Sequence, residues 1–433
     1  MNGVRLAGKR EAAFLEWTLK QFPLPARVRI PLQHSAETPA IACVRPGQHV
    51  NAGDIIAEPA APASVYIHAS ISGKVTAIES FPHPELGEAP AVEIQAGRDD
   101  KSIETIPPKA DPPGSGGKER RGWEDISEKD LLEMFRTHGL LALGREGVPG
   151  LHAQAAADKR RKAGVLVLNA CETEPYVSTS YCLMMSHPVE MLKGAELLRR
   201  VTGAKKIIVA VAEDCVEAAE ILKSKVFFLR WEHCEIRVLP QRHPQGMNSV
   251  LTSTVAGAER AAIYDPATAF AAYQAAALGK PFYETAVTVG GECVVQPRTV
   301  WACIGTSFQD LIKNCRGMMR EPRKVLMGGP MLGITQLSLE VPVLKTTRAV
   351  LALPREATDF EAIEACIRCG RCIEACPAGI SPAMIALAAE QNLFSLAREY
   401  GAGDCIACGN CAYVCPAKRP MTELVLYGAA GHI

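Results

Sequence analysis

The sequence lacks an excess of charge of either sign, and it lacks long apolar runs. Lys plus Arg and Asp plus Glu each number 47 among 433 residues, so the formal net charge is zero. Without a basic excess the chain has no general attraction to nucleic-acid phosphates, which argues against a nucleic-acid partner. No apolar stretch approaches the roughly 20 residues that span a membrane, and residues 1–21 carry charges where a signal peptide has its apolar centre. We expect a cytoplasmic protein that reaches the cytoplasmic face of a membrane only through partners.

Cysteine, by contrast, is abundant, with 16 residues in the chain. In a long chain without a secretion signal, many cysteines indicate metal ligation or redox chemistry rather than a disulfide framework. Eight are scattered between Cys43 and Cys315, whereas the other eight lie close together between Cys366 and Cys415. The length corresponds to about three domains at roughly 150 residues each, and a hydrophobic content of 48% suffices for their cores.

Residues 1–98 predict a small β-domain, with short β-rich runs between turns. The expected strands lie near residues 28–30, 40–44, 54–57 and 70–75. The segments VRPGQHV (44–50) and SGKV (72–75) resemble the hairpins of a barrel-sandwich domain of the biotinyl/lipoyl kind. Such domains expose a modifiable lysine at a hairpin tip, but residues 59–64 contain none. We therefore interpret this domain as structural or docking.

Residues 99–122 are rich in Pro, Gly and charge and poor in apolar residues, which predicts a linker. Beyond it, β-rich runs at 165–168 and 207–211 alternate with a helical period over 188–201, which indicates a parallel α/β layer. An Ala-rich helix is expected over 267–278. A second β-rich piece follows, with a strand at 286–291 and a short helix at 308–314.

The clustered cysteines form two copies of one spacing, C-x2-C-x2-C-x3-C-P. This spacing indicates two 4Fe-4S clusters, because three cysteines spaced in this way can wrap one face of a cluster. In bacterial two-cluster ferredoxins the cysteine before Pro ligates the other cluster. By that rule one cluster takes Cys366, Cys369, Cys372 and Cys415, and the other takes Cys405, Cys408, Cys411 and Cys376.

A zinc ribbon is the alternative for these cysteines. It pairs two C-x2-C units and needs neither a third cysteine nor a repeated Cys-Pro, so the spacing favours iron and sulfur and a role as an electron wire. No pair among the scattered cysteines has ligand spacing, which disfavours a third cluster. Cys43, Cys293 and Cys303 lie in apolar strand contexts, where we expect them to be small core residues.

Motifs in order along nearly the whole chain resemble the RnfC family, the NADH-oxidising subunit of the Rnf electron-transport complex, which is related to the flavin subunit of respiratory complex I. The cobalamin-reductase relative PduS is also similar, but its glycine-rich loop lies at the N-terminus, whereas here the β-domain comes first. The motifs are IPLQH (30–34), IHASISG (67–73), NACETEPY (169–176), PQG (244–246), GKP (279–281), GGPM (328–331), PVLKT (342–346) and both cysteine quartets.

The resemblance implies an α/β multidomain fold. Its expected segments are a barrel-sandwich hybrid β-domain (1–98), the linker (99–122), a parallel, Rossmann-like α/β domain of the complex I flavin-subunit type (123–265), a β-grasp-like SLBB segment (266–355) and a ferredoxin-like α-domain with two 4Fe-4S clusters (356–433).

In this family a loop of the type G-x-x-G-x-G-G-A-G-F-P-T-x-x-K and a following E-x-E-P segment bind FMN and NADH. Glycines there let backbone amides approach phosphate, and the lysine adds a positive charge. The corresponding loop here is residues 139–153. The resemblance implies a cofactor-binding set of Gly139, Gly144, Gly147, Glu172 and Glu174.

The loop also departs from the family pattern. Ala153 stands at the lysine position, and Arg145 and Glu146 replace a glycine and an alanine. A carboxylate at 146 opposes phosphate binding unless Arg145 neutralises it. Downstream, Ser180 and Asn248 stand where the family has acidic residues.

Two functions therefore stay open. In one, the chain is part of an NADH-dependent oxidoreductase and passes electrons from NADH through FMN to two 4Fe-4S clusters and on to a partner. In the other, it is a flavin-free electron-relay subunit between a partner dehydrogenase and ferredoxin or a membrane complex. The expected partners are other redox subunits, of an Rnf-type membrane complex or a cytoplasmic dehydrogenase, and ferredoxin.

Overall fold

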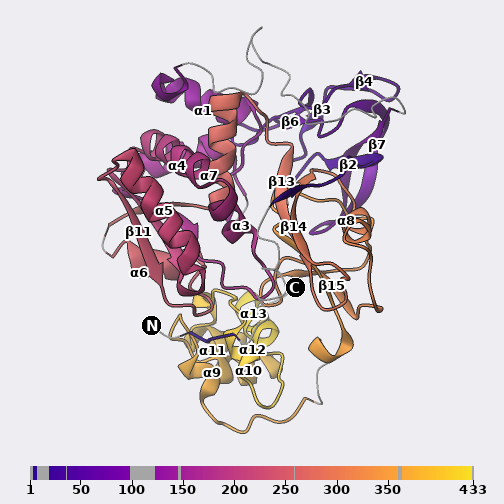
Figure 1. Ribbon diagram of the computed structural model, residues 1–433. Helices are drawn as coiled ribbons and strands as arrows, with labels where there is room; N and C mark the ends of the chain where they lie inside the picture. The colour runs from indigo at the N-terminus through magenta and orange to yellow at the C-terminus, as the bar shows by residue number, and fades with distance from the viewer. Residues whose placement is uncertain are drawn as a thin grey trace.

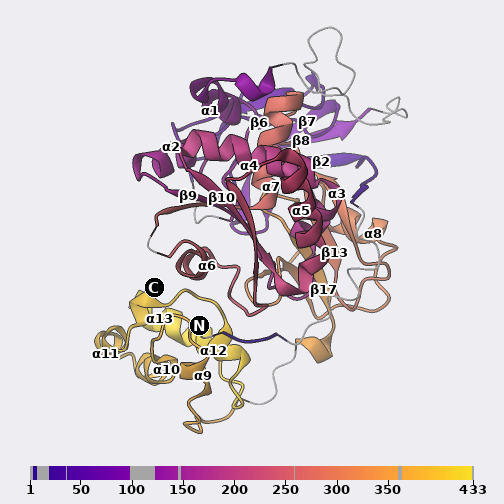
Figure 2. The same cartoon turned by 60° about the vertical axis from the view of Figure 1, so that its left-hand side comes forward.

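The computed structural model describes residues 3–6, 19–35, 37–97, 122–144, 148–257, 259–358 and 363–431. The predicted linker falls outside these ranges except for Gly122, so it stays a prediction. Figure 1 shows four parts in chain order: a β-domain, an α/β domain, a mixed-sheet domain and a small helical domain. The helical domain lies below the α/β domain and the mixed sheet in Figures 1 and 2, where both can contact it.

The β-domain contains two small sheets, with strand orders β2-β8-β7-β4 and β3-β5-β6. Inward side chains such as Val28, Ile56 and Ile94 are fully buried. They belong to one hydrophobic cluster with Val287 and Phe308 of the mixed-sheet domain, so these two domains share a core. The strands are β2 (Arg27–Pro31), β3 (Ile41–Ala42), β4 (His49–Val50), β5 (Ile55–Glu58), β6 (Ile67–His68), β7 (Gly73–His83) and β8 (Gly87–Ala96).

The α/β domain is built on four parallel strands in the order β11-β10-β9-β12. The central strand β9 is an apolar run buried on both faces, as in sheets covered by helices on two sides. The strands are β9 (Val165–Ala170), β10 (Lys206–Ala212), β11 (Cys234–Leu239) and β12 (Ala261–Tyr264). The helices are η1 (Trp123–Asp125), α1 (Glu128–Thr137), α2 (Leu151–Arg160), α3 (Thr179–Ser186), α4 (Pro188–Thr202), η2 (Glu213–Cys215), α5 (Val216–Leu229) and α6 (Asn248–Val255).

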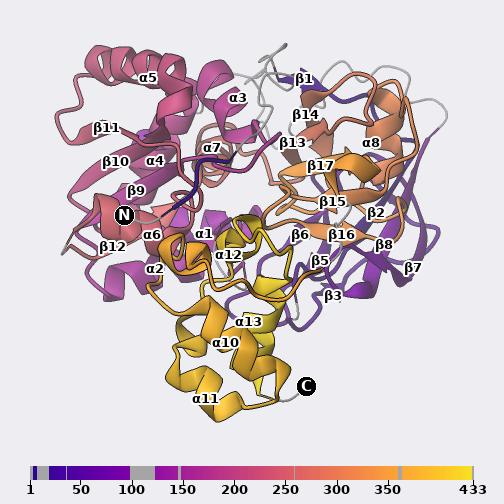
Figure 3. The same cartoon turned by 90° about the horizontal axis from the view of Figure 1, so that it is seen from below.

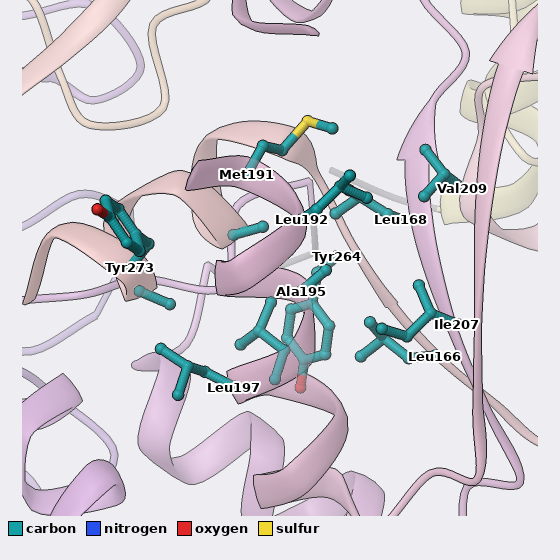
Figure 4. Packing of buried hydrophobic residues seen from close by; sticks show 14 of the residues in the cluster. Leu166, Leu168, Met191, Leu192, Ala195, Leu197, Ile207, Val209, Tyr264 and Tyr273 are labelled. Atoms are coloured by element: carbon teal, nitrogen blue, oxygen red, sulfur yellow. The ribbon is translucent and has the colours of Figure 1, made fainter. Parts of the chain in front are cut away.

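The largest hydrophobic core lies between α4 and the sheet. Met191, Leu192 and Ala195 of α4 are fully buried and belong to the same cluster as Leu166 and Ile207 of the strands (Figure 4). The helix begins with a proline in its first turn and ends at a glycine in the left-handed conformation, which are favourable residues for those two positions.

Gly194 of α4 faces α7 (Pro266–Tyr273), and a methyl group there would overlap the backbone carbonyl of Ala269. We expect Gly194→Ala to lower the free energy of unfolding by about 2–3 kcal/mol, because two helix backbones must separate. Urea unfolding followed by circular dichroism measures this change. Gly403→Ala is the matched control, since a methyl group at 403 meets nothing within 4 Å. Equal midpoints for the two variants would contradict the close approach of α4 and α7.

The mixed-sheet domain contains six strands in the order β1-β14-β13-β17-β15-β16. The Ala-rich helix predicted before it is α7 followed by the π-turn η3 (Gln274–Leu278), and it packs against α4 of the α/β domain. We therefore propose a domain boundary at Gly279 instead of after residue 265. The remaining elements are β1 (Lys20–Gln21), β13 (Glu284–Gly290), β14 (Arg298–Cys303), α8 (Phe308–Asn314), β15 (Lys324–Met327), β16 (Ile334–Gln336), β17 (Ala349–Leu353) and η4 (Arg355–Ala357).

The helical domain is a pseudo-repeat around a small apolar core that includes Ile385, Ala397 and Val425. Figure 2 shows its helices below the sheets, and Figure 3 shows them from below, in front of the other domains. Across the described part of the chain, no helix combines the length and apolarity needed to cross a membrane. The elements are α9 (Arg371–Glu374), α10 (Pro382–Glu390), α11 (Phe394–Glu399), η5 (Ala402–Asp404), α12 (Asn410–Tyr413) and α13 (Met421–Ala430).

Candidate cofactor sites

The helical domain encloses two small cavities, each lined by four cysteines. Every quartet joins three cysteines of one copy of the spacing to the last cysteine of the other copy. One cavity is lined by Cys366, Cys369, Cys372 and Cys415. The second is lined by Cys376, Cys405, Cys408 and Cys411. The folded chain thus brings together the two crossed quartets that the spacing predicts.

The chemistry of these quartets suits a cluster. Within the described residues, no three His, Cys, Asp or Glu side chains converge on a point as ligands of one metal ion do. A 4Fe-4S cluster needs no such point, because each thiolate binds a different iron. Burial raises the pKa of Cys411 to about 12, so without iron its thiol is protonated, and binding of a cluster must displace that proton.

Seven of the eight scattered cysteines are buried, which fits small core residues. Cys43 is the exception and corrects the expectation, because it is exposed. It follows the two-residue strand β3, which ends at Ala42, so no sheet covers it. Cys171 lines a large cavity of the α/β domain.

That cavity has a volume of about 780 Å³ and lies at the carboxyl ends of β9 and β12. Asn169 and Cys171 come from the end of β9, and Tyr264 and Asp265 from the end of β12. The chain runs from β9 to β10 on one side and returns to β12 on the other. Cofactors of open parallel sheets bind at such a point of reversal.

Glu172, the second residue after β9, lies in the cavity wall and is hydrogen-bonded to the start of α3. Its carboxylate accepts hydrogen bonds from the backbone N–H groups of Ser180 at 2.7 Å and Tyr181 at 3.2 Å. Ser180 stands where the family has an acidic residue, and here it contributes its backbone N–H group to this contact. A carboxylate at a helix N-terminus is stabilised by the unpaired amides of the first turn.

Glu174 joins the cavity to the mixed-sheet domain. Its carboxylate accepts hydrogen bonds from the backbone N–H groups of Met331 at 2.9 Å and Leu332 at 2.8 Å. A side chain at Gly329 would overlap this carboxylate, which explains the second glycine of the GGPM motif. Burial raises the pKa of Glu174 to about 7, although the two hydrogen bonds oppose that rise.

We expect infrared difference spectra between pH 5 and pH 9 to show one protonated carboxyl that titrates near pH 7 and is missing in Glu174→Gln. Because the pKa in the folded state exceeds the ordinary value of 4.5, the folded chain loses stability relative to this variant as pH rises from about 4.5 to about 7. The full difference is about 3 kcal/mol. Glu85→Gln is the control for a second carboxyl with a raised pKa that lies outside the cavity. An unchanged band in Glu174→Gln would contradict the assignment.

The predicted glycine-loop residues separate in space. Gly144 lines the cavity, whereas Gly139 is absent from its lining. Gly139 instead accepts a hydrogen bond through its carbonyl from Lys345 Nζ at 2.6 Å, and a side chain there would also strike the carbonyl of Tyr66. Its role is thus to join three domains. Gly147, with Arg145 and Glu146, lies outside the described residues.

Several residues that line the cavity are absent from the binding set predicted from the sequence. The amide of Asn169 donates to the carbonyl of Gly246 at 2.7 Å, and the amide of Asn248 donates to the carbonyl of Gly144 at 2.7 Å. Arg348 forms an ion pair with Asp265, which also caps α7. The position of Asn169 and Asp265 at strand ends was the available signal, whereas nothing local marks Arg348.

His243 connects the large cavity to the cysteine quartet of the second cavity. Burial lowers its pKa, so the ring is neutral at pH 7. Its Nε2 lies 2.7 Å from the carbonyl oxygen of Cys408, which can only accept, so Nε2 donates. Asn410 donates its amide to the carbonyls of both His243 and Ala375, at 3.2 and 3.1 Å. Two segments of the quartet are thereby tied to the cavity wall.

A parallel-sheet cavity joined to two four-cysteine cavities defines a multidomain electron-transfer protein of the iron–sulfur class. Family models match in the predicted order and confirm the predicted fold class: an RnfC barrel sandwich hybrid domain (1–99), a Nuo51 FMN-binding domain (136–276), an SLBB domain (286–335) and a 4Fe-4S dicluster domain (360–416). The chain belongs to the RnfC family.

Two relatives extend over most of the chain. One is the C subunit of a proton-translocating ferredoxin:NAD(+) oxidoreductase complex of Clostridium ljungdahlii, 32% identical over 94% of this chain and 88% of that one. The other is the C subunit of a Na(+)-translocating ferredoxin:NAD(+) oxidoreductase complex of Acetobacterium woodii, 31% identical over 93% and 90%. A solved NAD+-reducing [NiFe]-hydrogenase is 13% identical, with a TM-score of 0.48 over 72% of this chain and 64% of that one.

Proposed function

We propose that the chain is the electron-transfer subunit of an RnfC-type oxidoreductase, which passes electrons from NADH through FMN to two 4Fe-4S clusters and on to a partner. The observation that carries this proposal is the direct link from the 780 Å³ cavity through His243 to the carbonyl of Cys408. The relatives act in ion-translocating ferredoxin:NAD(+) oxidoreductase complexes, so the partners are redox subunits of such a complex. The chain then works at the cytoplasmic face of the membrane.

The cavity fits a flavin nucleotide in size and in the chemistry of its walls. A side chain at Gly246 would overlap the carbonyl of Cys171, so glycine keeps two segments of the wall in contact. Arg161 lines the same cavity with an exposed guanidinium and would supply the positive charge that Ala153 lacks. When bound, a flavin supplies the exchange between two-electron and one-electron chemistry that 4Fe-4S clusters lack.

The residues of the chain hold the two ends of the electron path. Glu172 and Glu174 fix the segment after β9 by four backbone hydrogen bonds. Thr173, between them, lies 3.4 Å from His243 Nδ1, which is free to accept its hydroxyl proton. We call the quartet of Cys376, Cys405, Cys408 and Cys411 the proximal quartet and that of Cys366, Cys369, Cys372 and Cys415 the distal quartet. The proximal quartet would hold the cluster that faces the cavity, and the distal quartet would hold the cluster that faces a partner.

Anoxic purification followed by an absorption spectrum and by iron and flavin counts tests this function. We expect about eight irons and about one FMN per chain, and bleaching of the flavin absorption by NADH. About eight irons without flavin would leave the relay function, which the alanine at position 153 favours. About four irons would contradict two clusters.

The same absorption measurement, made on two variants, tests where NADH and the flavin bind. Glu172→Gln replaces a carboxylate that accepts two backbone hydrogen bonds, so the start of α3 loses one partner and the cavity wall shifts. We expect NADH bleaching to fall more in Glu172→Gln than in Cys171→Ala, its neighbour in the lining. Equal losses would mean that the site is misplaced.

A further inference from the structure

The amino ends of the parallel strands carry a local excess of positive charge. The N–H of Lys205 donates to the carbonyl of Gly164, and the N–H of Gly164 donates to the carbonyl of Arg260, so the segments before β10, β9 and β12 lie side by side. The formal net charge of the whole chain is zero, and the composition therefore hides this excess. Nine cations and three carboxylates lie in the three segments, which are residues 158–164, 196–206 and 259–260.

Some of these cations have partners inside the fold. Lys159 pairs with Glu128 at 2.6 Å, and Arg199 pairs with Glu196 at 2.7 Å. Arg200 donates to two backbone carbonyls before α1. These three cations lie in the last turns of α2 and α4, where positive charge also complements the helix dipole. Their role is explained by the fold alone.

A second group of cations is exposed and, in the part of the chain that the structure describes, has no carboxylate partner. Arg260 is exposed as well and donates to a backbone carbonyl. The carboxylates of this edge are already engaged or covered, since Glu259 pairs with Lys206 and Asp158 is buried. Anions from outside the chain must therefore neutralise the second group, which comprises Arg160, Lys162 and Lys205.

Two large apolar side chains are exposed at the same edge. Helix α5 connects β10 to the parallel strand β11, so its last turn lies where β11 begins. There the carbonyl of His233 accepts from the N–H of Ile207 at the start of β10. In that last turn Phe227 is 86% exposed and Phe228 is 80% exposed. Figure 3 shows α5 at the outer side of the α/β domain, apart from the helical domain.

Exposed aromatic rings beside unpaired lysines and arginines are typical of proteins that lie on a membrane surface. The cations approach the anionic headgroups, and the rings enter the boundary between headgroups and acyl chains. In the described part of the chain no helix can cross a membrane, so a surface contact of this kind is the direct route to a bilayer that the structure offers.

We propose that this basic edge, comprising Arg160, Lys162, Lys205, Phe227 and Phe228, docks directly on an anionic phospholipid bilayer. The contact adds to the route through partner subunits that the sequence predicts, and it does not depend on the proposed electron transfer. The cavity lies at the carboxyl ends of β9 and β12, so a bilayer at the amino ends leaves it uncovered. Arg161 is exposed but lines that cavity, and we leave it out of the basic edge.

Flotation of the full chain with vesicles tests this docking. The protein should float with vesicles of phosphatidylglycerol and phosphatidylcholine in equal parts at low salt, and stay behind with pure phosphatidylcholine. Lys162→Glu/Lys205→Glu should weaken the partition by at least about tenfold, because each lysine near an anionic surface contributes about fivefold. Phe227→Ser/Phe228→Ser should weaken it by at least about fivefold, since the rings no longer enter the lipid.

Arg45→Glu/Lys74→Glu is the matched control, because both side chains are exposed on the β-domain and the net charge changes equally. Its partition should stay within about twofold of the wild type. Unchanged circular dichroism shows that each variant is folded, and the assay uses neither NADH nor flavin, so it is independent of the proposed function.

Three results would overturn the proposal. The first is a wild type that stays behind with both kinds of vesicle. The second is an equal loss of partition in the Lys162→Glu/Lys205→Glu variant and in the control, which would make the effect one of overall charge. The third is an unchanged partition of Phe227→Ser/Phe228→Ser together with displacement of the wild type from vesicles by polyglutamate. That result would make the basic edge a contact for an acidic protein.

Discussion

Replacing Cys411 with alanine should abolish electron delivery beyond the cavity, with a fall of at least about 100-fold in the rate from NADH to an external protein acceptor. Cys411 lines the proximal cavity and is 8% exposed, so no solvent ligand can readily replace its thiolate. The iron content should fall from about eight to about four per chain. Reduction of flavin by NADH should persist, because the large cavity does not include this residue.

Cys369→Ala tests the order in which the two clusters receive electrons, and not only whether both clusters are present. This variant should lose the distal cluster yet still show the proximal cluster reduced by NADH in electron paramagnetic resonance spectra. Cys315→Ala, at a buried cysteine of the shared β-core, is the matched control and should keep about eight irons. If the distal cluster of Cys411→Ala were reduced by NADH as fast as in the wild type, the order of the two clusters would be wrong.

Gly246→Ala should weaken FMN binding by at least about 100-fold, the second large effect. A methyl group at this position would overlap the carbonyl of Cys171, which belongs to the backbone and cannot rotate away. The turn must move, and it carries the carbonyl that accepts from Asn169. A displacement of even about 1 Å at a preorganised site is enough for such a loss. Fluorescence titration of the flavin-depleted protein with FMN measures it.

Two controls separate this effect from a general loss of stability. Gly403→Ala adds a methyl group in open space and should bind FMN as the wild type does. Iron content reports on the helical domain of the Gly246→Ala variant and should remain near eight. An unchanged dissociation constant for FMN in Gly246→Ala would show that this wall does not form the flavin site.

A buried lysine where the domains meet makes a contact that its sequence motif, PVLKT, does not reveal. Lys345 lies in the PVLKT segment and appears in the sequence as an ordinary strand-end lysine. In the folded chain it is buried, and its Nζ donates to the carbonyl of Gly139, 206 residues earlier in the sequence. Burial lowers the pKa of Lys345 to about 7. No local pattern predicts a contact of that separation.

The sequence by itself determined the cysteine quartets, because the C-x2-C-x2-C spacing is a local property of one loop and the crossed fourth ligand follows from the repeat. It also determined the β-domain and the parallel layer, since apolar periodicity and turn residues act over a few residues. The order of the domains followed from the resemblance of its motifs to the RnfC family.

Only the tertiary structure decided where the 780 Å³ cavity lies and which quartet faces it. Gly246 meets Cys171, Glu174 meets Met331 and His243 meets Cys408 across 75 to 165 residues of chain. Such contacts depend on how four domains pack, because each partner is an ordinary residue in its own segment. The same packing places Gly139 outside the lining of the cavity and leaves the distal loop open to solvent.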